Sequence, residues 1–437
     1  MEPVSADAYL TELPDGTVKQ RNPFTGTEVW TVPGRGNRPL GLPHPHARSL
    51  TPSDLTHACA FCVGRYLETP PEKSRVLRDA AGWRVVEAVQ AHAALDTVAE
   101  FRRVPNLFEI LGYEYWNQNH GFTLPAAVRR RRDVYLASAE GRAHVAAVMA
   151  AKLRASGLDP TLLPEDHLLE RATGFFGGGH DVIIARRHFV DDAATDAELA
   201  SSGTLTPDEH ARFIAYAADA ARDGYAQNPH ARYVVVFQNW LRPAGASFDH
   251  LHKQVVAVDE VGGQQEAVLR RVADNPNVFN DDALNVAVAQ GLVIAANAHC
   301  IAFAGFGHRY PTIEVYSTSA TCEPWSHTEA ELRGVSDVLH AVHAALGADV
   351  PCNEEWHYRP AGVTAAMPWR IMVKLRVSTL AGFEGATKLY LNTVAPATLR
   401  ERLVPRLLEL RATGTVSGDL AIGGEADIRP DPLPQPG

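Results

Sequence analysis

Cysteine is scarce in this chain, with five in 437 residues: Cys59, Cys62, Cys300, Cys322 and Cys352. Five widely spaced cysteines are too few and too uneven for a disulfide framework. We therefore expect the chain to stay reduced, in the cytoplasm. Of these cysteines, Cys59 and Cys62 alone have the spacing of metal ligands.

Long apolar runs and an excess of basic residues are also missing. No apolar run approaches the roughly 18 residues of a membrane-spanning helix, and residues 1–7 lack the pattern of a signal peptide. The net charge of −10 argues against nucleic acid or an anionic membrane as a partner, because both reward a basic surface. The hydrophobic content of 46% is enough to bury a sizeable core. A small anionic substrate would need a local positive site.

The stretch His250-Leu251-His252-Lys253-Gln254 carries groups for phosphate or metal chemistry at every second position. Side chains of an extended strand alternate between faces, so His250, His252 and Gln254 are predicted to share one face. A neutral imidazole is a nucleophile near pH 7, since its unperturbed pKa is about 6.5. Gln254 can hold a phosphoryl oxygen without a repelling charge. The alternative is a core histidine held by hydrogen bonds.

The segment Cys59-Ala60-Phe61-Cys62 is a C-x-x-C pair, and two thiolates at this spacing can chelate one zinc ion. A closed site needs two more ligands. The candidates are His188 and His250, with His180 as a rival. Such a set would connect separate segments and hold the backbone beside the nucleophile. Two buried cysteines without a metal are the alternative reading of the spacing.

The same order of strands and a helix occurs twice along the chain. This repeat predicts an internal duplication and an α+β fold with antiparallel strands. The first copy has a strand at 181–185, a capping box at 206–209, a helix, and strands at 233–237 and 250–258. The second has a strand at 312–316, a capping box at 326–329, a helix and a strand at 369–375. We place the boundary at Gly262-Gly263, which gives halves of 1–262 and 263–437. The second half is expected to end in a short disordered tail.

The catalytic groups are expected in the first half alone. In the second copy, Arg370 and Met372 are predicted to take the strand positions of His250 and His252. Residues 28–32 are predicted to form an edge strand that leads into a loop. Residues 109–175 are predicted to form a helical insertion, because they are rich in alanine and other helix formers.

Several stretches form an ordered set along the chain. They are 22–26 with Arg35 and Arg38, 59–64 with 69–72, 103–108, 180–184 with His188, 237–239 with Ser247 and 250–254, and 382–384 with Asn392 and Pro396. Together they resemble the galactose-1-phosphate uridylyltransferase family of the histidine-triad superfamily. The resemblance covers roughly residues 20 to 405 and leaves the insertion outside.

The resemblance implies a fold and a set of roles. The fold is two histidine-triad-like halves, each an antiparallel half-barrel sheet with packed helices. The site would hold one zinc ion and a nucleophilic histidine, and it would be completed by a second copy of the chain in a homodimer. The implied metal ligands are Cys59, Cys62, His188 and His250. The implied catalytic residues are His252, Gln254 and Ser247, and the implied substrate contacts are Asn106, Asn239, Arg35, Arg38 and Glu384, with Glu384 meeting the sugar in the neighbouring site.

The activity that the resemblance implies is nucleotidyl transfer in galactose metabolism. His252 would take a nucleoside monophosphate, uridylyl by analogy, from a nucleotide-sugar and pass it to a sugar-1-phosphate. One alternative is a nucleoside-polyphosphate phosphorylase of the diadenosine tetraphosphate type, although such enzymes generally lack the C-x-x-C. Another is a nucleotide-binding protein without enzymatic activity.

Some positions depart from the family pattern. The family has proline and glycine where this chain has Leu251 and Lys253, and asparagine and proline at the positions of Phe248 and Asp249. Many members hold a second metal with a His-x-His in the C-terminal half, which this chain lacks. We therefore predict no second metal, and the sugar and the base stay open.

Overall fold

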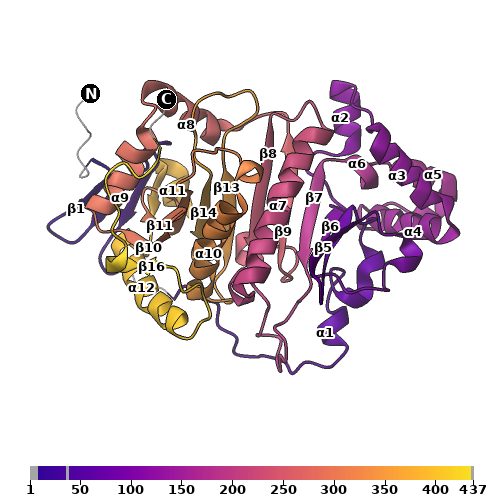
Figure 1. The fold of residues 1–437 in the computed structure, drawn as a ribbon, viewed down its shortest axis with the longest axis horizontal. Helices are drawn as coiled ribbons and strands as arrows, with labels where there is room; N and C mark the ends of the chain where they lie inside the picture. The colour runs from indigo at the N-terminus through magenta and orange to yellow at the C-terminus, as the bar shows by residue number, and fades with distance from the viewer. Residues whose placement is uncertain (1–7, 36–38, 435–437) are drawn as a thin grey trace.

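The fold is built around one long antiparallel sheet (Figure 1). The computed structural model describes residues 8–35 and 39–434. The sheet has twelve strands, all paired antiparallel. Their order across the sheet is β16 (Ala421–Ile422), β10 (Val293–Asn297), β11 (Cys300–Gly305), β12 (Thr312–Ser317), β14 (Arg370–Leu375), β13 (Cys352–His357), β8 (Tyr233–Trp240), β9 (His252–Val258), β7 (His180–Ala185), β6 (Phe101–Pro105), β4 (Ser74–Asp79) and β5 (Gly82–Glu87).

The sheet consists of two halves that meet at β8 and β13, which confirms the predicted duplication. From that junction outward, the first half runs β8-β9-β7-β6-β4-β5 and the second runs β13-β14-β12-β11-β10-β16. Phe237 pairs with Glu355 across the junction. Phe237 also pairs with Gln254 within its half, and Glu355 pairs with Met372 within the other. The two halves are therefore arranged about a pseudo-twofold axis at the junction of β8 and β13.

One face of the sheet is covered by two long helices, one from each half, α7 (Pro207–Gln227) and α10 (Glu329–Leu346), with α12 (Pro396–Ala412) beside them (Figure 1). The helix α7 starts at the predicted capping box, in which Thr206 accepts from the backbone of Glu209. The predicted box at 326–329 is wrong by two residues. Ser326 ends the short turn η8 (Pro324–Ser326), and α10 is capped by Thr328 and Glu331 instead.

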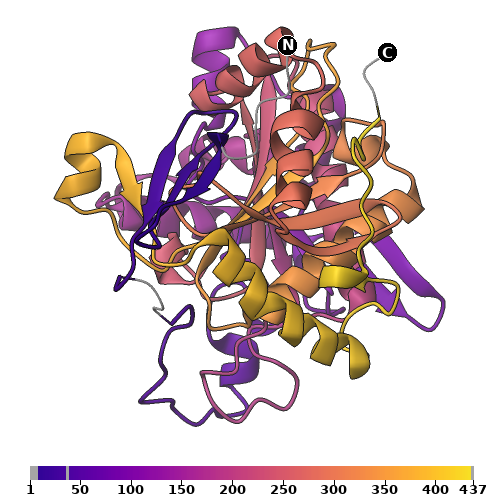
Figure 2. The same ribbon diagram turned by 90° about the vertical axis from the view of Figure 1, so that its left-hand side faces the viewer.

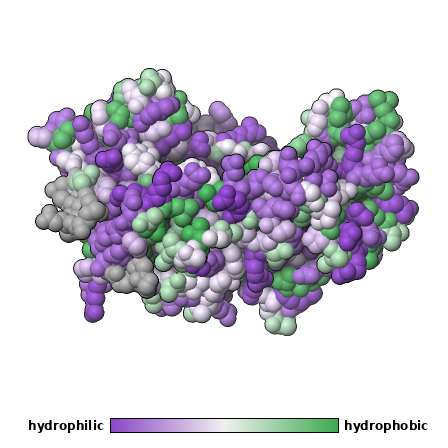
Figure 3. Space-filling view, turned by 90° about the horizontal axis from the view of Figure 1, so that it is seen from above, coloured by the Kyte–Doolittle hydropathy of each residue, from purple (hydrophilic) through white to green (hydrophobic). Residues whose placement is uncertain are grey.

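The segment between β6 and β7 contains a series of helices at the right-hand end of the molecule. They are α2 (Tyr113–His120), α3 (Ala126–Ala137), α4 (Ala139–Ala155), α5 (Glu165–Arg171) and α6 (Gly174–Gly177). Seen from above, the outline is indented between this lobe and the main body (Figure 3). Shorter helices elsewhere are α1 (Asp54–His57), α8 (Gly263–Asp274), α9 (Asn285–Ala289) and α11 (Gly382–Thr387).

A second, four-stranded sheet lies against the second half (Figure 2). It consists of β1 (Leu10–Glu12), β2 (Val18–Arg21), β3 (Glu28–Thr31) and β15 (Leu389–Leu391). The prediction of an edge strand at 28–32 is wrong, because β15 pairs with the free side of β3. Phe24, in the turn between β2 and β3, packs on Phe279 of the second half, with ring centroids 5.1 Å apart.

The C-terminal segment is folded as far as residue 434, where the sequence suggested a disordered tail. Leu433 is buried, and its backbone exchanges hydrogen bonds with the side chain of Asn280. Among the described residues, no helix is long and apolar enough to cross a membrane.

Candidate functional site

Four separated side chains converge into a metal-binding cluster in the first half. Cys59 and Cys62 lie in the turn before η2 (Val63–Glu68), His188 follows β7, and His250 lies in the bend before β9. Their ligand atoms all lie within 4.8 Å of one another. The prediction of these four as one cluster is confirmed. Within the described residues, His180 is not part of any such cluster.

The spacing of the donor atoms fits a tetrahedral metal ion. The two thiol sulfurs are 3.8 Å apart, and the Nδ1 atom of His250 is 3.4 Å from Cys59 Sγ and 3.8 Å from Cys62 Sγ. Two sulfurs that each lie about 2.3 Å from a tetrahedral zinc are about 3.8 Å apart. His250 Nε2 donates to the carbonyl oxygen of Ala185 at 2.7 Å, which leaves Nδ1 free as the ligand atom. The cluster can therefore bind one metal ion, and among the described residues it consists of these four donors.

The thiols of the cluster are electrostatically coupled. Contact with Cys59, and then hydrogen bonds with His188 and His250, hold the pKa of Cys62 well below its usual value against the effect of burial. The same pairing, together with burial, raises the pKa of Cys59. One thiolate is thus already favoured in the folded chain, which suits a site for a divalent cation.

His252 is held in one tautomer with a free ring nitrogen. The strand β9 begins at His252, so His250 lies in the preceding bend and not on the predicted strand face. The Nδ1 atom of His252 lies 2.7 Å from the carbonyl oxygen of His250. A carbonyl oxygen only accepts, so Nδ1 carries the proton and Nε2 keeps its lone pair. Burial lowers the pKa of His252 to about 4, so the ring is neutral near pH 7. The ring of Phe61 lies edge-on, with centroids 5.3 Å apart.

Gln254 is oriented by His180, the first residue of β7. The backbone N–H of Ile110 donates to His180 Nδ1 at 3.1 Å, which places the histidine proton on Nε2. That proton is donated to Gln254 Oε1 at 3.0 Å, and Asn106 Nδ2 lies 3.4 Å from the same oxygen. With its oxygen occupied, the amide of Gln254 presents its N–H groups. The structure thus brings the predicted residues Gln254 and Asn106 together.

Asn239 lies on the same open face of the sheet as Gln254. The pairing of Phe237 with Gln254, extended by two residues, places Asn239 opposite His252. Asn353 of the second half donates to Asn239 Oδ1 at 2.8 Å. A cavity of about 420 Å³ lies beside these groups, over β8 and β13, and includes Phe237 and Asn239 in its lining. This volume is in the range of small-molecule sites.

Lys253 points to the opposite, helix-covered face, as the strand alternation predicts. Its ammonium group lies 5.0 Å from the centre of the Phe213 ring in α7. Lys253 Nζ is 2.5 Å from Glu354 Oε1 and 3.1 Å from Gln238 Oε1, and neither ion of the pair is exposed. Lys253 therefore binds the two halves together and leaves the phosphate chemistry to the other face.

Among the described residues, no hydrogen bond joins the remaining predicted residues to this group. Ser247 is exposed in the loop before β9, and Arg35 is exposed after β3. Glu384 lies in α11, where its carboxylate accepts from the backbone N–H of Ala381 at 3.1 Å. Arg38 lies outside the described residues. Arg35 follows β3 of the small sheet, and α11 precedes β15 of the same sheet.

Comparison with known proteins identifies the family of this chain. Residues 13–434 match a family described as a domain of unknown function, DUF4921. The chain belongs to this family. ADP-glucose phosphorylase of Arabidopsis thaliana is 23% identical over 387 residues, which cover 86% of this chain and 89% of that protein.

Solved structures support the GalT-like fold of this DUF4921 chain. A crystal structure of an ADP-glucose phosphorylase from Arabidopsis thaliana with bound ADP-glucose superposes with a TM-score of 0.58 at 19% identity, covering 89% of this chain and 97% of that one. A GalT-like protein from the same plant gives a TM-score of 0.55 at 18% identity, covering 88% and 97%. The predicted α+β fold and the likeness to galactose-1-phosphate uridylyltransferase are confirmed at the level of the fold.

The second half of this DUF4921 chain has different residues at the corresponding positions. Arg370 is the first residue of β14 and pairs with Tyr316, and His252 is the first residue of β9 and pairs with Ile184. The strand pairs fix the register within each half and not the residue-by-residue match between the halves. The predicted equivalence of Arg370 and Met372 with His250 and His252 therefore stays a prediction.

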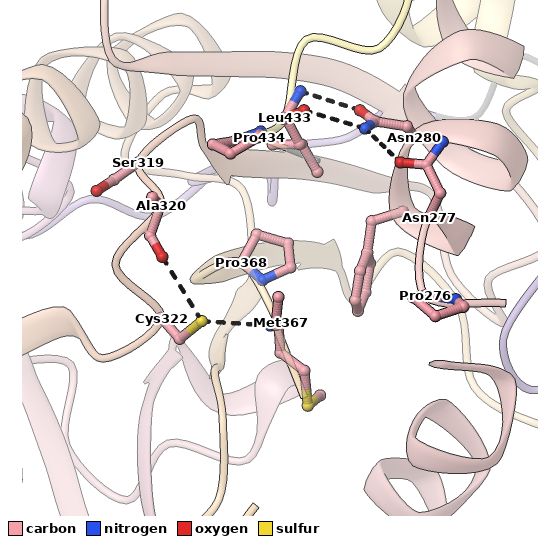
Figure 4. A pocket seen from close by; sticks show the side chains of 12 residues that line it. Pro276, Asn277, Asn280, Ser319, Ala320, Cys322, Met367, Pro368, Leu433 and Pro434 are labelled. Carbon is pink, nitrogen blue, oxygen red and sulfur yellow. Dashed lines mark hydrogen bonds between the residues drawn. The ribbon is translucent and has the colours of Figure 1, made fainter. Parts of the chain in front are cut away.

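Pro368 lies two residues before β14, and the metal ligand His250 lies two residues before β9. Pro368 lines a cavity of about 230 Å³ with Cys322, Met367 and Leu433, which face one another in Figure 4. The Cys322 sulfur accepts from the backbone N–H of Met367 at 3.3 Å. Proline offers no ligand atom, which is the physical reason to expect no second metal here. That expectation stays a prediction.

Residues that the sequence did not assign also shape the site. His180 was considered as a rival metal ligand, and its role as the group that orients Gln254 was missed. Phe61 and Asn353 were not singled out. The signal for His180 was its place directly before the predicted strand at 181–185. No sequence signal connects Asn353 with Asn239, because they are 114 residues apart.

Buried neutral histidines predict a loss of stability in mild acid. Burial lowers the pKa of His180 to about 4 and that of His340 to about 4. An unfolded histidine titrates near 6.5, so the unfolded chain takes up protons first as the pH falls. The stability from these groups is complete above about pH 6.5 and is lost toward pH 4, by roughly 2 kcal/mol per histidine at pH 5.

Denaturant unfolding at pH 7 and pH 5 measures this effect. His340 Nε2 donates to the carbonyl oxygen of Leu205 at 2.7 Å, so His340→Gln keeps a donor and removes the titration. This variant is expected to lose less stability between the two pH values than the wild type. His92→Gln, at an exposed position, is the control. Equal pH dependence in the wild type and His340→Gln would contradict the prediction.

Proposed function

We propose that this protein is a nucleotidyltransferase that acts through a covalent nucleotidyl-histidine on His252. The observation that carries the proposal is the state of the His252 ring. Its Nδ1 atom is occupied by the His250 carbonyl, its Nε2 lone pair is free, and the amide of Gln254 lies two residues along the same face. This arrangement supplies a neutral nucleophile and an uncharged donor for a phosphoryl oxygen. The fold shared with the GalT-like proteins supports it.

In the first step, His252 Nε2 attacks the α-phosphorus of a nucleotide-sugar. A bond from Nε2 to phosphorus forms, and the bond from phosphorus to the bridging oxygen breaks. Sugar-1-phosphate leaves with the electron pair of that bond. The ring becomes cationic, and the His250 carbonyl that accepts from Nδ1 stabilises this charge. Gln254 donates to an equatorial oxygen of the transferred group.

In the second step, a phosphate-bearing acceptor takes the nucleotide from His252. An acceptor oxygen attacks the same phosphorus, and the bond to Nε2 breaks and returns its electron pair to the ring. The resemblance favours a sugar-1-phosphate acceptor and a uridylyl group. The Arabidopsis relative named as an ADP-glucose phosphorylase favours inorganic phosphate and an adenylyl group. Both acceptors fit one ping-pong scheme, because the first half-reaction is the same.

Three further roles belong to this proposal. The Cys59, Cys62, His188 and His250 cluster would hold a structural zinc ion that fixes the backbone of His250, and so the acceptor for His252 Nδ1. Asn106 and Asn239 would contact the nucleotide, and Ser247 the phosphoryl group. Arg35, Arg38 and Glu384 would contact the substrate, and Glu384 would meet the sugar in the site of a second copy in a homodimer.

Intact-protein mass spectrometry tests the proposal directly. The purified chain is incubated with UDP-galactose, UDP-glucose, ADP-glucose and diadenosine tetraphosphate in turn, and any adduct is located by peptide mapping. We expect a nucleoside monophosphate on His252, and its mass identifies the base. Adding inorganic phosphate or a sugar-1-phosphate to the labelled protein identifies the acceptor. Nucleotide binding without an adduct would instead favour a binding protein, and no adduct with any donor would contradict the proposal.

Metal removal is expected to lower stability, because the cluster connects three separate segments. Elemental analysis of the purified chain should give one equivalent of zinc. Chelation, or Cys62→Ser, should remove it and lower the unfolding temperature, whereas Cys322→Ser should keep it. Two equivalents of metal would refute the prediction of a single site. A chain that folds equally well without metal would refute the structural role.

A further inference from the structure

The second half contains a large basic cavity that the transfer reaction does not use. It has a volume of about 520 Å³ and lies between β13, β14, α8 and the small sheet. Asn22 and Tyr390 of the small sheet, Gln264 of α8, and Asn353 and Glu355 of β13 contribute to its wall. Its cationic side chains are Arg309, Arg370, Lys374 and Arg376, with His308 beside them.

The positive charges of the cavity exceed the negative ones. Glu355 pairs with Lys374, with 2.6 Å between Oε2 and Nζ. Nearby, Glu314 pairs with His308 at 2.7 Å. Within residues 8–35 and 39–434, no carboxylate lies within ion-pair distance of Arg309, Arg370 or Arg376. Around this cavity, three guanidinium groups thus have no direct ion pair with a described carboxylate, and Glu314 reaches Arg370 only through the hydroxyl of Tyr316.

Two of these guanidinium groups are also short of hydrogen-bond acceptors. Arg376 Nε is buried without any partner, while its Nη1 donates to Asn353 Oδ1 at 2.7 Å. Arg370 is 1% exposed and packs against the rings of Phe24 and Phe279, and its one hydrogen bond, to Tyr316 Oη, is long at 3.4 Å. Burying a cation with so few acceptors is costly unless an anion supplies the rest.

We propose that this cavity binds a phosphorylated small molecule through its phosphate group. Arginine forks match the geometry of phosphate oxygens and make strong charge-assisted hydrogen bonds with them. Arg376 and Arg309 would hold the phosphate, with Arg370 at the cavity wall. The amide of Gln264 and the ring of Tyr390 are available to the rest of the molecule. A volume of about 520 Å³ is larger than a free phosphate ion needs, so a phosphate ester is the occupant that fits best.

The proposed site is distinct from His252 but lies on the same face of the sheet. Lys374 pairs with Asn353, and the register continues through Asn239 to His252. Three strand spacings separate β14 from β9, which is about 14 Å. Asn353 touches both sites, because it accepts from Arg376 and donates to Asn239. This binding site does not depend on His252 being a nucleophile.

Calorimetric titration of the full chain tests the site. The probes are inorganic phosphate, glucose-1-phosphate, UMP and AMP, and all variants carry His252→Gly, so that no covalent transfer interferes. Arg309→Gln is the principal variant, because Arg309 is exposed and contacts only aromatic rings. Arg376→Gln is the second variant. Arg406→Gln, on the outer surface of α12, is the matched control.

We expect at least one probe to bind, and each cavity variant to weaken that binding at least about tenfold, while Arg406→Gln leaves it unchanged. Tighter binding of an ester than of inorganic phosphate would identify the ester as the occupant, and equal binding would identify free phosphate. The proposal would be overturned if no probe bound. It would also be overturned if folded Arg309→Gln bound every probe with an affinity within twofold of that of the parent protein. Labelling of His252 is measured separately in the wild type. The two experiments therefore test the phosphate site and the transfer reaction independently.

Discussion

Replacing His252 with glycine is expected to abolish the covalent adduct and to lower nucleotidyl transfer by at least about 10⁴-fold. His252 is the only histidine of β9, and its tautomer is fixed by the His250 carbonyl 2.7 Å away. Glycine removes the nucleophile and leaves the metal cluster intact, since His252 is not one of the four ligands. Mass spectrometry after incubation with a nucleotide-sugar measures the adduct, and steady-state kinetics measure the transfer.

A variant of Gln254, two residues further along β9, supplies the control for this experiment. Gln254→Ala keeps the nucleophile and removes the amide that faces the phosphoryl group. We expect it to keep the adduct on His252 while slowing its formation by about 10²-fold to 10³-fold. The zinc content and unfolding temperature of both variants should equal those of the wild type. A His252→Gly protein that still carries a nucleotide on another residue would remove His252 from its assigned role.

Breaking the Lys253–Glu354 ion pair is expected to cost roughly 3–5 kcal/mol of unfolding free energy. Both side chains are fully buried, and the pair joins β9 of one half to β13 of the other. Burial opposes the ionisation of Glu354, but Lys253 and His343 hold its pKa below the usual value. Lys253→Met leaves that carboxylate buried without its main counter-ion. Guanidinium unfolding, read by circular dichroism, measures the loss.

The double variant Lys253→Met with Glu354→Gln separates the charge from the packing. A glutamine at this position keeps a carbonyl for the indole N–H of Trp356, which lies 2.7 Å from Glu354 Oε1, and removes the uncompensated charge. We expect the double variant to be more stable than Lys253→Met alone. Arg406→Met, which breaks the exposed pair with Glu409, should change stability by less than about 1 kcal/mol. Equal stability of Lys253→Met and the wild type would contradict the prediction.

The local patterns that could be predicted are those that short-range geometry controls. Strand alternation placed Lys253 on the face away from Gln254, and the C-x-x-C spacing identified two of the four cluster ligands. Where the chain bends, the prediction was wrong. His250 was expected on the strand face, yet it lies in the bend before β9 and points to the cysteines. The capping box of α10 was displaced by two residues, because a turn at 324–326 precedes the helix.

The register between strands could not be derived from the sequence. The pairs Phe237–Glu355 and Asn239–Asn353, which join the two halves, form between strands far apart in the chain. Likewise, the sequence placed residues 28–32 at a sheet edge. The strand that covers this edge comes from residues 389–391, far along the chain.

The sequence by itself determined the chemical inventory of this protein: a neutral histidine with a glutamine two residues on, a pair of cysteines, and a chain arranged as two similar halves. These follow from residue identity and from spacings within one element. The tertiary structure alone decided that His180 orients Gln254, that Asn353 connects Asn239 to Arg376, and that three arginines with no direct ion pair to a described carboxylate surround one cavity. Such contacts join residues far apart in sequence, and their formation depends on strand register and on packing of the whole core, which no local pattern encodes.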